Sequence, residues 1–173
     1  MSRNWMDRTD VRILDLLQRE GRISNVELAE RVALSPTPCL RRVKRMEEAG
    51  LIVGYRAELD RRAVGLGVTA FVSINIERHG PEATKAFVEA VSNIDAVVAC
   101  HVLTGSFDFL LEVVTPTLDE YSDVMLERLG GLPGVTSLQT MIALKSQWRP
   151  RTLPLDHLAR DTERGGQGDG RGD

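Results

Sequence analysis

The sequence predicts an α+β protein, with an N-terminal helix-turn-helix followed by a C-terminal ferredoxin-like βαββαβ sandwich domain. Three capped helical segments fill the first fifty residues, and strand and helix patterns then alternate in the order β-α-β-β-α-β. The apolar content of 42% in 173 residues indicates a packed core. We expect four segments: a DNA-binding domain at 1–51, a wing or hinge strand and linker at 52–67, a ferredoxin-like domain at 68–148, and a C-terminal extension at 149–173, disordered from about 160.

The first two helices are marked by capping residues. Asp7 can cap a helix that ends near Gly21, and Asp10 lies in its first turn, where a carboxylate favours the helix dipole. Ser24 and Glu27 form an S-x-x-E capping box that begins a second, short helix of about ten residues.

The third helix begins in the stretch "LSPTPCLRRVKR". Ser35 is a good N-cap, and Pro36 and Pro38 then fall in the first helical turn, where backbone N–H groups have no intrahelical acceptor. The prolines therefore set the start of the helix and stiffen it. Its buried face is expected to contain Leu40, Val43 and Met46, and Gly50 ends it.

A short helix, a four-residue link and a basic helix together predict a helix-turn-helix that binds double-stranded DNA. The second helix of such a motif enters the major groove with its N-terminus first. We expect four residues to approach base edges, namely Ser35, Thr37, Cys39 and Arg41. Three further residues are expected to meet phosphate, namely Arg42, Lys44 and Arg45.

The distribution of charge agrees with this division. Residues 1–62 hold 13 Lys and Arg against 10 Asp and Glu, a net charge of +3, whereas residues 63–173 hold 9 against 15, a net charge of −6. A basic N-terminal part joined to an acidic remainder is typical of a protein in which only one part meets phosphate.

The apolar patterns of the second half of the chain predict strands in "VTAFVSINIE", "DAVVACHVLT", "FLLEVV" and "VTSLQTMIALKS". They predict helices in "PEATKAFVEAVSN" and "TLDEYSDVMLERLGG". If both helices cover one face of a four-stranded sheet, the other face is left apolar. Such a face predicts burial against a second copy of the chain, and a two-fold dimer would present two recognition helices to paired half-sites.

The run "LSPTPCLRRVKRMEEAGLI" resembles the recognition helix of the Lrp/AsnC (leucine-responsive/asparagine-responsive, or feast/famine) family of transcription regulators. The resemblance continues through "HVLTGSFDFLLEV" and "LPGVTSLQT" and covers about residues 5–148. It implies that the helix-turn-helix is winged and that the second domain binds an amino-acid effector and oligomerises. It also implies a homodimer that assembles further, to a tetramer, an octamer or a larger disc.

The resemblance implies an effector site between dimers. Its residues would be Gly105, Ser106 and Asp108 in a turn, Leu118 at the start of the second helix, and Thr140, Met141, Ile142 and Ala143 on the last strand. Asp108 would meet the ammonium group of the effector, whereas without the resemblance it would be read as a turn-capping residue. Ser106 stands where many members have a second acid, so the effector's identity is left open.

The remaining features point away from other classes. The three histidines are widely spaced, and Cys39 and Cys100 lie 61 positions apart, so we expect no metal site, cofactor or disulfide framework. No window is apolar enough to span a membrane, and a cytoplasmic protein is expected. An enzyme on the same fold is a weak rival, because the sheet offers little beyond His101 and Asp108. The stronger alternative is an architectural DNA-binding protein that responds to no ligand.

Overall fold

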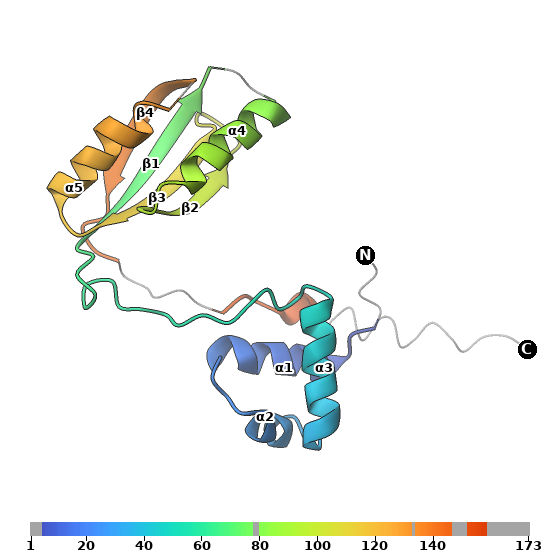
Figure 1. The fold of residues 1–173 in the computed structure, drawn as a ribbon. Coiled ribbons are helices and arrows are strands. Elements are labelled where there is room, and N and C mark those ends of the chain that lie inside the picture. Colours follow the sequence, from blue (N-terminus) through green and yellow to red (C-terminus); the bar gives the residue numbers. More distant parts are fainter. Residues whose placement is uncertain (1–4, 78–79, 133, 147–151, 159–173) are drawn as a thin grey trace, which may run out of the picture. The chain divides into compact units, whose positions relative to one another are not determined.

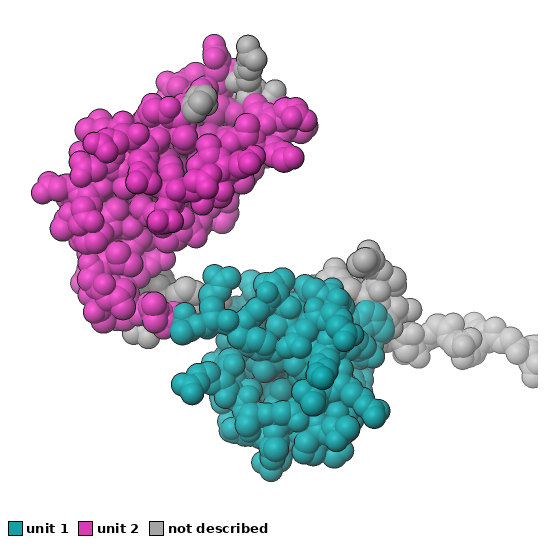
Figure 2. Space-filling model, in the orientation of Figure 1, with its two compact units in different colours: residues 1–57, 148–173 teal, residues 58–147 magenta. Residues whose placement is uncertain are grey.

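The computed structural model describes residues 5–77, 80–132, 134–146 and 152–158 and divides the chain into two compact units (Figures 1 and 2). Unit 1 comprises residues 1–57 and 148–173, and unit 2 comprises residues 58–147. The disorder predicted from about residue 160 lies outside the described residues. Among the described residues, no helix is both long and apolar enough to cross a membrane.

Unit 1 contains three helices around one apolar core: α1 (Arg8–Arg19), α2 (Asn25–Arg31) and α3 (Pro36–Glu48). Asp7, Ser24 and Ser35 are their N-caps, as predicted. The reciprocal capping box lies in α1, between Asp7 and Asp10. In α2 only half of the predicted box forms, because the Ser24 hydroxyl accepts from the Glu27 N–H while the Glu27 carboxylate binds Arg31.

The turn between α2 and α3 is a Schellman motif. The N–H of Leu34 donates to the carbonyl of Ala29 at 2.9 Å, and the N–H of Ala33 donates to the carbonyl of Glu30 at 3.1 Å. This motif requires a left-handed residue after the helix, and here it is Ala33, with a φ of 57°. Glycine adopts that conformation without steric cost, so the turn that positions α3 is held under backbone strain.

The segment after α3 carries no strand. A wing or hinge strand was expected within residues 52–67, but these residues form no strand in the structure. A strand needs a neighbouring strand for its backbone N–H and carbonyl groups, and this segment pairs with none in the described part of the chain. The Tyr55 hydroxyl instead donates to the Glu47 carboxylate of α3 at 3.0 Å. Burial, together with this bond to a carboxylate, raises the pKa of Tyr55 to about 12.

The C-terminal extension returns to unit 1. The Gln18 side chain on α1 forms two hydrogen bonds with the backbone of Leu153, accepting from its N–H at 2.7 Å and donating to its carbonyl at 3.4 Å. Residues 156–158 form a helical turn, and the Leu158 side chain is buried. The extension therefore becomes part of the helical unit, which its position in the sequence did not indicate.

Unit 2 has the predicted βαββαβ order. Its elements are β1 (Val68–Ile76), α4 (Pro81–Ser92), β2 (Val97–Val102), β3 (Phe109–Thr115), α5 (Leu118–Asp123), a π-helical continuation η1 (Val124–Leu129) and β4 (Val135–Ile142). The sheet order is β2-β3-β1-β4 with all neighbours antiparallel, and α4 and α5 lie on the same side of it (Figure 1). The last strand ends at Ile142 rather than at Ser146, and the π-helical stretch was not predicted.

The covered face of the sheet forms the core of unit 2. Alternate residues of β1 point into it, and the rings of Phe87 on α4 and Phe109 on β3 lie with centroids 4.2 Å apart. On the opposite face Phe71 is paired with Met141 on β4 and with Glu112 on β3. Arg61 binds that glutamate at 2.6 Å. The open face is therefore mixed rather than uniformly apolar as predicted.

Candidate DNA interface and effector site

The N-terminus of α3 is tied to the start of α2. The side chain of Asn25, the first residue of α2, donates to the carbonyl of Pro36 at 2.9 Å. The Ser35 side chain is exposed and makes no capping hydrogen bond, although its carbonyl accepts the first helical bond from Cys39 at 3.3 Å. The first turn of α3 is thus held by the turn, by two prolines and by α2, while Ser35 faces solvent.

One stripe of α3 is exposed, and it contains Thr37, Leu40, Arg41 and Lys44. Residues spaced by three and four lie on one side of a helix, so these four form a continuous face. The prediction that Leu40 is buried is wrong, because 43% of its surface is exposed. Its apolar side chain lies on the outer face, next to Arg41 in the sequence.

Cys39 lies on the opposite side of α3. It is fully buried in the core of unit 1 with Val43 and Met46, and these residues follow the i, i+4, i+7 spacing of a helical inner face. The prediction that Cys39 approaches base edges is therefore corrected. Burial also raises the pKa of the Cys39 thiol, against an opposing effect of the nearby Arg42 charge.

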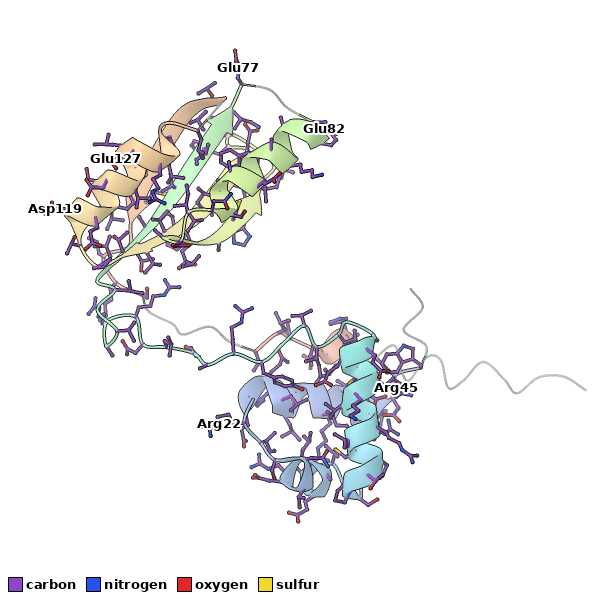
Figure 3. All side chains as sticks on the ribbon, viewed as in Figure 1. Arg22, Arg45, Glu77, Glu82, Asp119 and Glu127 are labelled. Carbon is purple, nitrogen blue, oxygen red and sulfur yellow. The ribbon has the colours of Figure 1, made fainter. Side chains whose placement is uncertain are left out.

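The structure places Arg42 and Arg45 against α1. Arg42 Nη1 lies 2.8 Å from both Asp7 Oδ2 and Asp10 Oδ1, and Arg45 Nη2 lies 3.1 Å from Asp10 Oδ2. Arg45, labelled in Figure 3, also makes a cation–π contact: its guanidinium carbon Cζ lies 4.3 Å from the centroid of the Trp5 ring. Both arginines, predicted to meet phosphate, already have carboxylate partners within the protein.

The contacts in this cluster shift the pKa values of Asp7 and Arg42. Burial alone would raise the pKa of Asp7, but the backbone N–H of Asp10 and the Arg42 guanidinium outweigh it, so the pKa lies below its usual 3.8. The hydrogen bond to Asp10 is the largest of the effects that raise the pKa of Arg42. The sequence signal for the cluster is the pair Asp7 and Asp10 at the start of α1, which by itself indicates only helix capping and stabilisation of the helix dipole.

The predicted effector turn lies at one end of the sheet. Gly105 has a φ of 125°, which side chains rarely adopt, and Ser106 beside it is exposed. Asp108 is tied to β1, because its carboxylate accepts from the Ile76 N–H at 2.9 Å and its own N–H donates to the Ile74 carbonyl at 3.0 Å. The carboxylate therefore links the turn to β1, which differs from the local turn-capping role that the residue type alone suggests.

The other predicted effector residues lie at the opposite end of the sheet. Thr140, Met141 and Ile142 pair with the first half of β1, where Ile142 faces Ala70, and α5 begins with an exposed Leu118 after β3 has ended. Ala143 follows β4 and is half-buried. Four to six strand residues, about 13–20 Å, separate Ala70 from the contacts of Asp108 on β1. One copy of the chain therefore does not bring the two groups together.

One contact at this second group was not predicted. The hydroxyl groups of Tyr121 on α5 and Thr140 on β4 lie 2.6 Å apart. This bond links the helix that begins at Leu118 to the strand that carries the predicted effector residues. No group of three His, Cys, Asp or Glu side chains within the described part of the chain is arranged to hold a metal ion.

Comparisons with known proteins match both units. A family described as "Winged helix-turn-helix DNA-binding" matches residues 6–53, and one described as "Lrp/AsnC ligand binding domain" matches residues 69–153. The leucine-responsive regulatory protein of Escherichia coli K12 is 41% identical over 140 residues, which cover 81% of this chain and 85% of that protein.

Solved structures agree in fold. A transcriptional regulator of Neisseria meningitidis in complex with L-Met is 41% identical, with a TM-score of 0.83, over 88% of this chain and 99% of that chain. An AsnC family transcriptional regulator of Agrobacterium tumefaciens is 36% identical, with a TM-score of 0.82 over the same shares. These relatives are regulators of transcription rather than enzymes.

Proposed function

The chain belongs to the Lrp/AsnC family of transcriptional regulators, and from this premise we propose how its residues divide the work of reading DNA and binding an amino acid. The family and the two matched domains identify a DNA-binding regulator with an amino-acid-binding domain. The winged helix-turn-helix and ferredoxin-like fold class is confirmed with them. We infer a cytoplasmic location, where such regulators meet DNA.

The exposed stripe of α3 carries the proposal for DNA. Ser35 and Thr37 lie at the stiffened helix start, where a recognition helix enters the major groove, and Arg41 follows one turn later in reach of a guanine edge. Lys44, a further turn along, would meet phosphate. The supporting observation is that this stripe is exposed and takes no part in the core or in the described contacts with α1.

The test is a binding-site selection from a random duplex library, followed by fluorescence anisotropy on the selected site and on random DNA. Arg41→Ala should weaken binding to the selected site about 10-fold or more while changing random-DNA affinity far less. Arg22→Ala is the matched control, because Arg22 lies on the α1–α2 connection away from α3 (Figure 3). An equal loss on both DNAs would instead favour the ligand-independent architectural protein.

For the effector, we propose a site shared between two copies of the chain. The turn at Gly105–Asp108 of one copy and the β4 end of another would enclose one amino acid, because the two groups of a single copy lie too far apart to touch it together. Asp108 would bind the ammonium group, with Leu118, Met141 and Ile142 offering an apolar surface to a side chain. The L-Met bound by the Neisseria meningitidis regulator, and the leucine in the name of the Escherichia coli relative, make methionine and leucine the first ligands to test.

The test is a thermal-shift and calorimetric screen of the twenty amino acids on the parent chain and on Asp108→Asn. Asparagine can still accept from the Ile76 N–H, so this variant removes the charge while keeping the bond that holds the turn. The ligand that shifts the parent should lose affinity about 10-fold or more on the variant and keep it on Glu82→Gln, an exposed charge control on α4. No shift with any amino acid would favour the architectural alternative.

We propose that the open sheet face pairs two copies into a homodimer, which then assembles to a tetramer or octamer. Phe71 and Met141 lie together on that face, and both are exposed in the single chain. Phe71→Asp should lower the molar mass of the assembly in solution, measured by light scattering. Leu126→Asp, at an exposed position of η1, should leave that mass unchanged. An unchanged mass for Phe71→Asp would contradict this pairing.

A further inference from the structure

Two arginines of the recognition helix converge on one buried carboxylate. Asp10 is fully buried, and both of its oxygens are used: Oδ1 accepts from Arg42, and Oδ2 accepts from Arg45 and from the backbone N–H of Asp7. Arg42 places the same Nη1 against the Asp7 carboxylate, also at 2.8 Å. The cluster therefore joins the first turn of α1 to the middle of α3.

Helical rotation divides the basic residues of α3 into two pairs. Arg42 and Arg45 are three residues apart and face α1, while Arg41 and Lys44, also three apart, face outward. Residues on neighbouring positions of one helix thus have different partners. The sequence "RRVKR" looks like a single cationic surface, yet only half of it is unoccupied by the α1 carboxylates.

An arginine held in this way is costly to recruit to DNA. Both bonds of Arg42 to these carboxylates use Nη1, and the charges of Asp7 and Asp10 already balance that of the guanidinium and would repel a phosphate that approached its other N–H groups. Moving the guanidinium away instead would leave Asp10 buried with less of its charge compensated. The free energy gained from a phosphate contact at an exposed surface is smaller than the free energy lost when a buried carboxylate loses its partner. Lys44 is exposed, so it can contact a phosphate without leaving a buried carboxylate.

We propose that Asp10 is a positioning residue, which fixes α3 on α1 and withholds Arg42 from the DNA backbone, so that the protein binds DNA of any sequence less tightly than the number of its basic residues suggests. The inference rests on the proposed use of the outer face of α3 to read DNA. Phosphate contacts add affinity for every sequence alike, so an arginine withheld from the phosphate backbone lowers the affinity for specific and for random DNA by about the same factor. Discrimination between sequences stays with the outward-facing Arg41.

The experiment measures the dependence of DNA affinity on salt, using a random-sequence duplex and the full chain. Lys44→Gln should reduce the slope of log K against log salt by about 0.9, as expected for one lost phosphate contact. Arg42→Gln should leave that slope unchanged while lowering the unfolding midpoint by about 10 °C or more. If Arg42 bound phosphate, Arg42→Gln would instead lower the slope as far as Lys44→Gln does.

A second pair of variants keeps the test decisive if Arg42→Gln does not fold. Asp7→Asn keeps a good N-cap and removes one carboxylate from Arg42, and Asp15→Asn makes the same charge change on α1 beside Arg19. Asp7→Asn should raise the affinity for random DNA several-fold more than Asp15→Asn does, because only Asp7 holds Arg42. Equal effects of these two variants would overturn the inference, as would a slope for Arg42→Gln that falls as far as that for Lys44→Gln. If Lys44→Gln itself leaves the slope unchanged, the proposed DNA face fails instead.

Discussion

Replacement of Cys39 by serine tests whether this position serves the core or the DNA groove. Serine is close to cysteine in shape, so packing around the fully buried side chain changes little. The serine hydroxyl, however, loses its hydrogen bonds to water when it is buried, which lowers the stability of the fold by about 1–3 kcal/mol if no partner in the protein replaces them. The Ser35 carbonyl four residues earlier can accept a bond from it, so the lower part of that range, about 1–2 kcal/mol, is expected.

For a domain of this size that loss corresponds to a fall of about 5–15 °C in the midpoint of thermal unfolding, measured by circular dichroism. DNA affinity measured well below the midpoint should keep its base preference. The control is Thr37→Ser on the exposed face, which should leave the midpoint unchanged and alter only DNA binding. If Cys39→Ser keeps the parent's midpoint but changes base preference, the inward orientation of Cys39 is refuted.

Three further predictions concern unit 1. Ala33→Gly should raise the unfolding midpoint by a few degrees, because a left-handed alanine costs about 1–2 kcal/mol and the added freedom of unfolded glycine offsets about 0.4–1 of it; a lower midpoint would contradict the strain. The lowered pKa of Asp7 contributes stability that is present above pH 3.8 and is lost as the pH falls below it. In acid titrations Asp7→Asn should therefore lose less stability between pH 4 and 2.5 than the parent. Gln18→Ala should remove two hydrogen bonds to Leu153 and about 1–2 kcal/mol of local stability, seen as faster hydrogen exchange at 152–158; unchanged exchange would show that Gln18 does not hold this segment.

Much of the fold could be predicted from local patterns. The N-caps at Asp7, Ser24 and Ser35 were recognisable because a capping side chain satisfies backbone groups within three residues along the chain. The βαββαβ order followed from the alternation of periods, since each element buries one face of its own. The strand predicted within residues 52–67 does not form, because a strand depends on a partner that local sequence does not supply.

The candidate sites could be predicted only in part. The exposed Thr37, Arg41 and Lys44 followed from helix periodicity, but the inner face was placed one residue out of phase, with Leu40 in the position that Cys39 occupies. Thiols and leucines are both frequent in cores, so composition does not choose between them. The effector residues came from family resemblance, and their separation to opposite ends of the sheet was visible only in the strand register.

By itself, then, the sequence determined where the helices begin, which elements alternate and which family the chain belongs to, because these depend on neighbours along the chain. Only the tertiary structure decided which basic residues are available to DNA. Arg42 and Lys44 are two positions apart in sequence, yet one lies against a buried carboxylate from α1 and the other faces water. That difference arises from a contact across more than thirty residues, which no local pattern encodes.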